Sequence, residues 1–138
     1  MSHPIRIAFP VSEMSLKIAD EIFDIIARAA TSSTKKRYHI QIVLSEIFHN
    51  AYIHGDRISA DTCIEFEACF DKNKFSASII NEGKGFADSK LKSTDVNHIY
   101  AESGRGLKII RKLSDKVEFK KINDNKFGVF VEINLSPK

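Results

Sequence analysis

The stretch SEIFHNAYIHG, residues 45–55, carries the pattern around which the rest of the sequence can be interpreted. Its apolar residues recur at the spacing of a helix, at Ile47, Phe48, Ala51 and Tyr52. Glu46, Asn50 and His54 recur every four residues and therefore share one face of that helix. The pattern predicts a carboxylate and an amide one turn apart.

Two interpretations of Glu46 and Asn50 stay open at this point. They can form an ordinary polar pair on an exposed helix surface. Within the largely apolar run 40–53 they can instead be partly buried, and buried polar groups need partners or a ligand. An amide oxygen suits Mg²⁺ beside substrate phosphates, and a carboxylate one turn away can accept a proton from an attacking hydroxyl or water.

Two Gly-x-Gly pairs follow, at 83–85 and 104–106. Each alone is a weak signal, and neither has the third glycine of a dinucleotide-binding fingerprint. The sequence also lacks a P-loop motif. The second pair leads into a predicted helix, whose free backbone amides favour an anion, and Arg105 and Lys108 add positive charge there.

Length and composition indicate one compact domain spanning residues 1–138. The formal net charge is +3, with both signs interspersed, so nothing indicates a nucleic-acid partner. No apolar run reaches the ~18 residues of a membrane span, and the N-terminus lacks a signal-peptide core. We therefore expect a cytoplasmic protein with no membrane partner.

The cysteines and histidines give no sign of a transition-metal site. Cys63 and Cys69 fall in one predicted strand, about 20 Å apart, too far for a disulfide. Two buried, reduced thiols are the expected state. His49 and His54 are five residues apart, which does not place them on one helix face for zinc.

The periodicities predict an ordered series of elements. Helix 12–30 would start at the N-cap Ser12 and bury Ile18, Ile22, Ile25, Ile26 and Ala29. Helix 35–54 would end at Gly55. The other elements are a strand at 5–9, a hairpin of strands 62–70 and 75–80, a lid at 87–103, a third helix beginning at the second glycine pair, and a hairpin of strands 117–122 and 127–135.

Strands grouped in antiparallel pairs, with helices between them, predict an α/β (α+β) two-layer sandwich. Helices would cover one face of a mixed, mainly antiparallel sheet.

Three motifs, each weak alone, together form a pattern that is specific to one protein family. E-x-x-x-N-A-x-x-H-G at 46–55, N-E-G-K-G-F at 81–86 and S-G-R-G-L-K-I-I-R-K-L-S-D-K-V at 103–117 resemble the GHKL (histidine kinase-like, Bergerat fold) ATPase and kinase family. The small size, the first strand ending in proline and the S-G-R-G-L sequence are most similar to its anti-sigma-factor serine/threonine kinase branch. The resemblance covers nearly the whole chain.

The resemblance implies one site for ATP and Mg²⁺. It makes Glu46 the general base and Asn50 the Mg²⁺ ligand, and makes 87–103 the ATP lid. Asn81 would contact the adenine. The other implied nucleotide-binding residues are the glycines that shape the base pocket and lid hinge and the motif that holds the phosphates, namely Gly83, Gly85, Gly104, Arg105, Gly106 and Leu107.

Asn81 departs from the family, which usually has Asp there to accept a hydrogen bond from the adenine amino group. An Asn carbonyl can still accept that bond, and its amide can donate to a ring nitrogen. The substitution leaves open weakened ATP binding or a degenerate site.

The resemblance therefore implies a protein kinase of a partner-switching system. It would transfer the ATP γ-phosphoryl group to a Ser or Thr of a small antagonist protein, resembling an anti-anti-sigma factor, and would also bind a sigma factor or another regulator. The alternative is a non-catalytic, nucleotide-gated module that binds a partner. A third reading is a detached ATP-binding domain of a sensor histidine kinase. Family members commonly act as dimers, although the sequence fixes neither the oligomeric state nor the partner.

Overall fold

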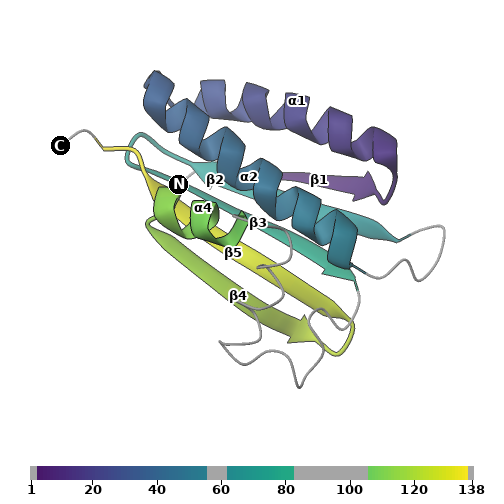
Figure 1. The fold of residues 1–138 in the computed structure, drawn as a ribbon. Coiled ribbons are helices and arrows are strands. Elements are labelled where there is room, and N and C mark those ends of the chain that lie inside the picture. The colour runs from purple at the N-terminus through teal and green to yellow at the C-terminus, as the bar shows by residue number, and fades with distance from the viewer. Residues whose placement is uncertain (1–2, 56–61, 83–105, 137–138) are drawn as a thin grey trace.

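The computed structural model in Figure 1 describes residues 3–55, 62–82 and 106–136. Its helices lie on one face of a five-stranded sheet. The helices are α1 (Glu13–Ala30), α2 (Thr34–His54) and α4 (Gly106–Leu113). The strands are β1 (Ile5–Pro10), β2 (Cys63–Phe70), β3 (Lys74–Glu82), β4 (Lys116–Asn123) and β5 (Lys126–Asn134). This arrangement confirms the predicted two-layer sandwich.

The sheet has the strand order β1-β2-β3-β5-β4. Each of the four described pairings is antiparallel, so the sheet of these residues is antiparallel throughout rather than mixed. The two predicted hairpins, β2–β3 and β4–β5, are both present, and the pairing of β3 with β5 joins them. The strand β1 pairs with β2 and lies at the edge of the sheet.

The start of α1 is fixed by two serines. Ser12 is the N-cap, as predicted, and its Oγ accepts a hydrogen bond from the backbone N–H of Ser15. The Oγ of Ser15 in turn donates to the carbonyl oxygen of Pro10 over 2.6 Å. This bond holds the first turn of α1 at the end of β1.

The face that α1 buries differs from the predicted one. Of the residues predicted to be buried, Ile26 is buried and Ile22 is half-buried against the core, whereas Ile18, Ile25 and Ala29 are exposed. The buried residues are Ser15, Ala19, Phe23, Ile26 and Ala27. Because most of these side chains are small, α1 can approach the sheet and α2 closely, and one large ring, that of Phe23, fills the remaining space. Two of the predicted isoleucines, Ile18 and Ile25, therefore lie outside.

Four phenylalanine rings join the helices to the edge of the sheet. The Phe23 ring of α1 lies 5.8 Å from that of Phe48 on α2 and 5.1 Å from that of Phe66 on β2. The ring of Phe9 on β1 lies 5.0 Å from that of Phe48. Edge-on and tilted contacts of this kind add to the free energy of burial, so this cluster fixes α1 and α2 over β1 and β2.

Cys63 and Cys69 lie in the same strand, β2, and form no disulfide, as expected, although both are half-buried rather than buried. None of the helices in the described residues is long and apolar enough to span a membrane.

Candidate functional site

The C-terminal turn of α2 meets the end of β3 at Gly55. Gly55 donates its backbone N–H to the carbonyl oxygen of Ala51 and ends the helix, as predicted. Its φ is −77°, so no left-handed conformation requires glycine. Space requires it instead, because a Cβ would lie 2.6 Å from the oxygen of Ala51 and 2.9 Å from Nδ2 of Asn81.

Asn81 occupies the end of β3 on the face that the helices cover. Its register neighbours, Ile64 on β2 and Phe127 on β5, are both buried, and Asn81 itself is only 7% exposed. Its Nδ2 donates to the carbonyl oxygen of Glu82 at the long distance of 3.5 Å. Such a bond is weak, so the amide can exchange it for a better acceptor.

Asn50 lies on α2, five residues before Gly55. It is 3% exposed, and its Nδ2 is buried without a hydrogen-bond partner among the residues described. A buried donor left unpaired costs on the order of 1–3 kcal/mol of stability. Buried polar groups in native proteins are rarely left so, which makes Asn50 a candidate to contact a ligand; Nδ1 of His39 and Oγ of Ser114 are likewise without a partner among the described residues.

Glu46 lies one turn before Asn50 on α2 and is half-buried. With a rise of about 1.5 Å per residue, the two Cα positions are separated by roughly 6 Å along the helix axis. Solvent reaches the half-buried Glu46 but not the buried Asn50. The exposed-pair interpretation therefore fails for Asn50, because Asn50 is buried.

A second polar cluster ties this part of α2 to α1. The Oγ of Ser45 donates to Oδ1 of Asp20 over 2.6 Å, and Nε2 of His49 lies 3.9 Å from Oδ2 of the same carboxylate. Ser45 and His49 flank Glu46 on α2. The contact therefore holds the turn that carries Glu46 against α1.

The helix α4 begins at Gly106 and packs against α2 and β4. Gly106 and Leu107 are buried in its first turn. The remaining predicted nucleotide-binding residues, namely Gly83, Gly85, Gly104 and Arg105, lie outside the described residues, as does the predicted lid 87–103. Of the predicted contacts that the structure describes, Asn50 is buried on α2 and Asn81 is buried at the end of β3, while Gly106 and Leu107 begin α4.

Two shallow grooves, of about 350 and 550 Å³, lie on the sheet face that carries no helix. Ion pairs cross this face, including Arg6 with Glu67 at 3.3 Å and Lys126 with Glu65 at 3.0 Å. Side chains alternate along a strand, so these grooves are separated from Asn50 and Asn81 by the sheet itself. The part of the chain that is described contains no group of three His, Cys, Asp or Glu side chains able to hold a metal ion.

The profile of the histidine kinase-like ATPase domain matches residues 9–131, which is most of the chain. The chain belongs to this family. No curated protein sequence matches it. The match extends from the end of β1 to β5 and so includes every element of the site.

A solved structure has a similar fold. The chain is similar to a chain in the crystal structure of the SiaB–SiaC complex from Pseudomonas aeruginosa, with a TM-score of 0.58 and 15% sequence identity. The match covers 94% of this chain and 89% of that chain. At this identity the similarity establishes the fold.

Sequence reasoning missed two features of the site. The Asp20–Ser45 contact joins residues 25 positions apart, and the local pattern of α2 does not indicate it. The second is the contact of Gly55 with Asn81. The sequence predicted Gly55 as the end of the helix. Only the packing of α2 against β3 shows that a Cβ at this position would clash with its neighbours.

Proposed function

We propose that this member of the histidine kinase-like ATPase family is a protein kinase that binds Mg-ATP at the α2–β3 junction. It transfers the γ-phosphoryl group to a Ser or Thr of a small partner protein. In its other partner state it binds a sigma factor or another regulator. A similar fold occurs in a two-protein complex, which supports a small protein partner.

The observation that carries the proposal is the unpaired amide of Asn50. A buried carboxamide lacking a partner fits a site for a metal-bound phosphate, because its oxygen is a hard ligand and its Nδ2 can donate to a phosphate oxygen. Its position one turn from Glu46 adds a base within the same site. Family membership supports ATP as the ligand.

Each residue has one role in this proposal. Asn50 holds the Mg²⁺, which when bound neutralises charge on the phosphates. Asn81 accepts a hydrogen bond from the base, and α4, with Gly104, Arg105, Gly106 and Leu107 at its start, holds the phosphates.

Glu46 removes the proton from the acceptor hydroxyl while the oxygen of that hydroxyl forms a bond to the γ-phosphorus. The bond from that phosphorus to the β–γ bridging oxygen breaks, and ADP leaves. The glycines Gly83 and Gly85 shape the base pocket, and 87–103 is the lid. The whole chain acts as one domain, and we place it in the cytoplasm, where ATP and a regulator of transcription are both present.

Glu46→Ala tests the chemical step. We expect transfer of ³²P from ATP to the partner protein to fall by roughly 10²–10⁴-fold, while nucleotide affinity changes little, because a general base acts only in the transition state. Glu118→Gln, on β4 and on the sheet face without helices, is the control and should transfer normally. Transfer that survives Glu46→Ala would remove Glu46 from the mechanism.

One observation favours the alternative of a non-catalytic, nucleotide-gated module. Asn81 has an amide where the family usually has a carboxylate to accept a hydrogen bond from the adenine amino group. That module would bind its partner with nucleotide-dependent affinity and would show no transfer in the wild type. Wild-type transfer to a serine or threonine excludes this alternative, and labelling of a histidine of the chain itself would instead indicate a histidine kinase.

A further inference from the structure

Positive charge is concentrated in one short part of the chain, residues 108–121. This segment covers most of α4 and the first part of β4, and its six basic and two acidic residues give it a net charge of +4, against +3 for the whole chain. The basic residues are Lys108, Arg111, Lys112, Lys116, Lys120 and Lys121. The attraction of this protein for acidic groups is therefore local rather than general.

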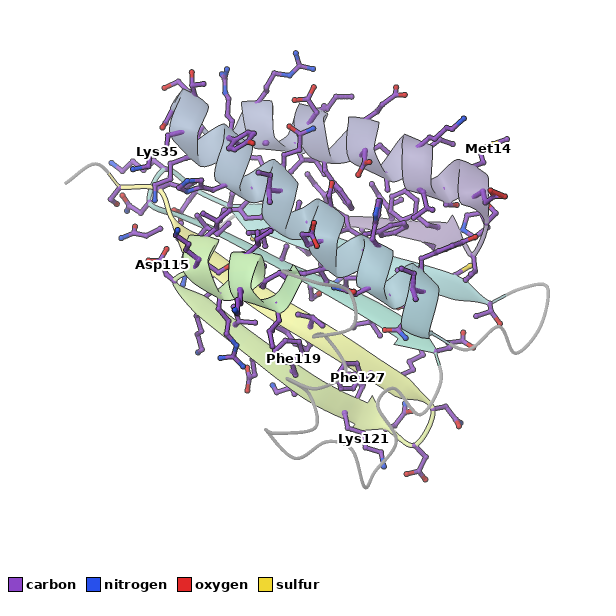
Figure 2. The ribbon with its side chains drawn as sticks, viewed as in Figure 1. Met14, Lys35, Asp115, Phe119, Lys121 and Phe127 are labelled. Atoms are coloured by element: carbon purple, nitrogen blue, oxygen red, sulfur yellow. The ribbon has the colours of Figure 1, made fainter. Side chains whose placement is uncertain are left out.

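The strand β4 is the last strand of the sheet, on the side opposite to β1. Figure 2 shows Asp115 where α4 gives way to β4 and Lys121 near the other end of the strand. Among the described residues β4 pairs with β5 alone, in regular register from Lys116 to Lys121. Every second residue of such a strand directs its backbone N–H and C=O groups away from its neighbour. An edge of this kind is a template for a further strand.

The sheet face without helices presents two lysines along β4. Lys116 and Lys120 are exposed, lie four residues apart and share this face. Glu118 lies between them, and its Oε1 is 3.9 Å from Nζ of Lys120. An exposed pair of this kind is weak, so it leaves the lysines able to attract acidic groups.

The helix-covered face of β4 is apolar at the same level. Val117 and Phe119 are half-buried and pack against the core. Cζ of the exposed Arg111 on α4 lies 5.9 Å from the centroid of the Phe119 ring. One face of the strand thus offers positive charge, and the other offers apolar side chains with a guanidinium beside them.

We propose that an extended, acidic segment of another protein adds to the sheet beside β4. Residues directly opposite each other on paired strands share a face, so this segment has Asp or Glu opposite Lys116 and Lys120. It has apolar residues opposite Val117 and Phe119, and no acidic residue opposite Glu118. The expected order is acidic, apolar, neutral, apolar, acidic, which is the same for either direction of the added strand.

Two other occupants fit this edge less well. A second β4 paired antiparallel about Glu118 would set Lys116 against Lys120 of the other copy, and like charges directly opposite each other destabilise a sheet. Lysines on an edge strand commonly prevent such pairing. A nucleic acid would satisfy the lysines, but it has neither a peptide backbone to pair with β4 nor apolar side chains for Val117 and Phe119. An acidic strand satisfies all three features.

The edge is separate from the candidate nucleotide site. In the sheet, β5 lies between β4 and β3, which carries Asn81. A segment bound beside β4 therefore takes no part in the proposed phosphoryl transfer and gives the chain a second contact for a partner. Because each exposed ion pair contributes little, we expect weak, reversible binding.

A peptide titration of the ¹⁵N-labelled chain, followed by backbone amide NMR signals without ATP, tests the edge. The peptide is Thr-Glu-Val-Thr-Val-Glu-Thr, blocked at both ends, and the control peptide has Lys in place of both Glu residues. The acidic peptide should give saturable shifts, largest between Lys116 and Lys121, and the basic peptide should give none there. No saturable shift at millimolar acidic peptide, or largest shifts elsewhere in the chain, would overturn the proposal.

A charge reversal on β4 tests the pairing. Lys116→Glu with Lys120→Glu should raise the dissociation constant of the acidic peptide at least about ten-fold and should allow the basic peptide to bind. Lys17→Glu with Lys72→Glu makes the same change of net charge at exposed positions of α1 and the β2–β3 turn. It should change the constant by less than about two-fold at physiological salt. Equal weakening in the two double variants would overturn the proposal.

A thymidine trinucleotide distinguishes a strand from a nucleic acid. It carries the same charge as the acidic peptide but has no peptide backbone, so it should shift the β4 signals less. Equal or larger shifts would overturn the strand in favour of a nucleic acid. These measurements use no ATP and do not involve Glu46 or Asn50, so the proposed strand and the proposed kinase can fail separately.

Discussion

Gly55 is required by the packing of its neighbours rather than by its backbone angle. An alanine Cβ would lie within 3 Å of the carbonyl oxygen of Ala51 and of Nδ2 of Asn81. Gly55→Ala should therefore lower the free energy of unfolding by about 1–3 kcal/mol, although an added Cβ at an unstrained glycine normally stabilises. Urea unfolding measures the difference.

Gly128→Ala is the matched control. A Cβ at Gly128 would lie 3.0 Å from the ring of Phe130 and 3.1 Å from Cγ1 of Ile80, and both side chains can shift. We expect a smaller loss of stability than at Gly55. Equal losses at the two positions would contradict the account of the α2–β3 junction.

His39 on α2 gives a pH dependence. Burial, with the charges of Lys36 and then Lys35, holds the pKa of His39 below its ordinary value of 6.5. As the pH falls below 6.5, the unfolded chain takes up a proton before the folded chain does, so the free energy of unfolding falls until the pH passes the folded pKa. His39→Gln should lack this fall in unfolding curves measured from pH 7 downward. If the free energy of unfolding of the wild type and of His39→Gln changed with pH in the same way, this prediction would be wrong.

The two long helices are joined by a polar contact as well as by their apolar faces. Asp20→Ala removes the acceptor of the Ser45 hydroxyl and should cost about 1 kcal/mol of stability. Asp20→Asn keeps an acceptor oxygen there and should cost less. Thermal unfolding of both variants measures these two losses of stability. A larger loss in Asp20→Asn than in Asp20→Ala would contradict a stabilising role of the Asp20–Ser45 hydrogen bond.

The elements themselves were largely predictable from the sequence. Ser12 and Gly55 mark helix ends by local chemistry, and strict alternation marks both hairpins, so these predictions needed no knowledge of distant residues. The face of α1 could not be predicted in this way. Its exposed row, with Met14, Ile18 and Ile25, is as apolar as the buried row, with Ala19, Phe23 and Ile26, so the spacing alone does not choose between them.

The sheet order and the site depend on contacts between distant segments. The pairing of β3 with β5 places Asn81 beside Phe127, 46 residues away, and nothing local encodes it. The spacing of Glu46 and Asn50 was sufficient to predict a shared helix face. It could not show that Asn50 is buried with an unpaired Nδ2, because burial depends on what packs over that face.

In the proposed function the whole molecule binds Mg-ATP through Asn50. A ligand at 100 times its dissociation constant adds about 2.7 kcal/mol, which for a chain of this length is a rise on the order of 10 °C in the unfolding temperature. Asn50→Ala should lose this rise, yet unfold without nucleotide close to the wild-type temperature, because Nδ2 has no partner to lose. Asn125→Ala, in the exposed β4–β5 turn, is the control.

The most direct measurement is therefore thermal unfolding of these three proteins without nucleotide and with Mg-ATP, Mg-ADP or Mg-GTP. We expect a magnesium-dependent rise with adenine nucleotides in the wild type and in Asn125→Ala, and no rise in Asn50→Ala. An unchanged unfolding temperature of the wild type at millimolar nucleotide, or an equal rise in Asn50→Ala, would contradict it.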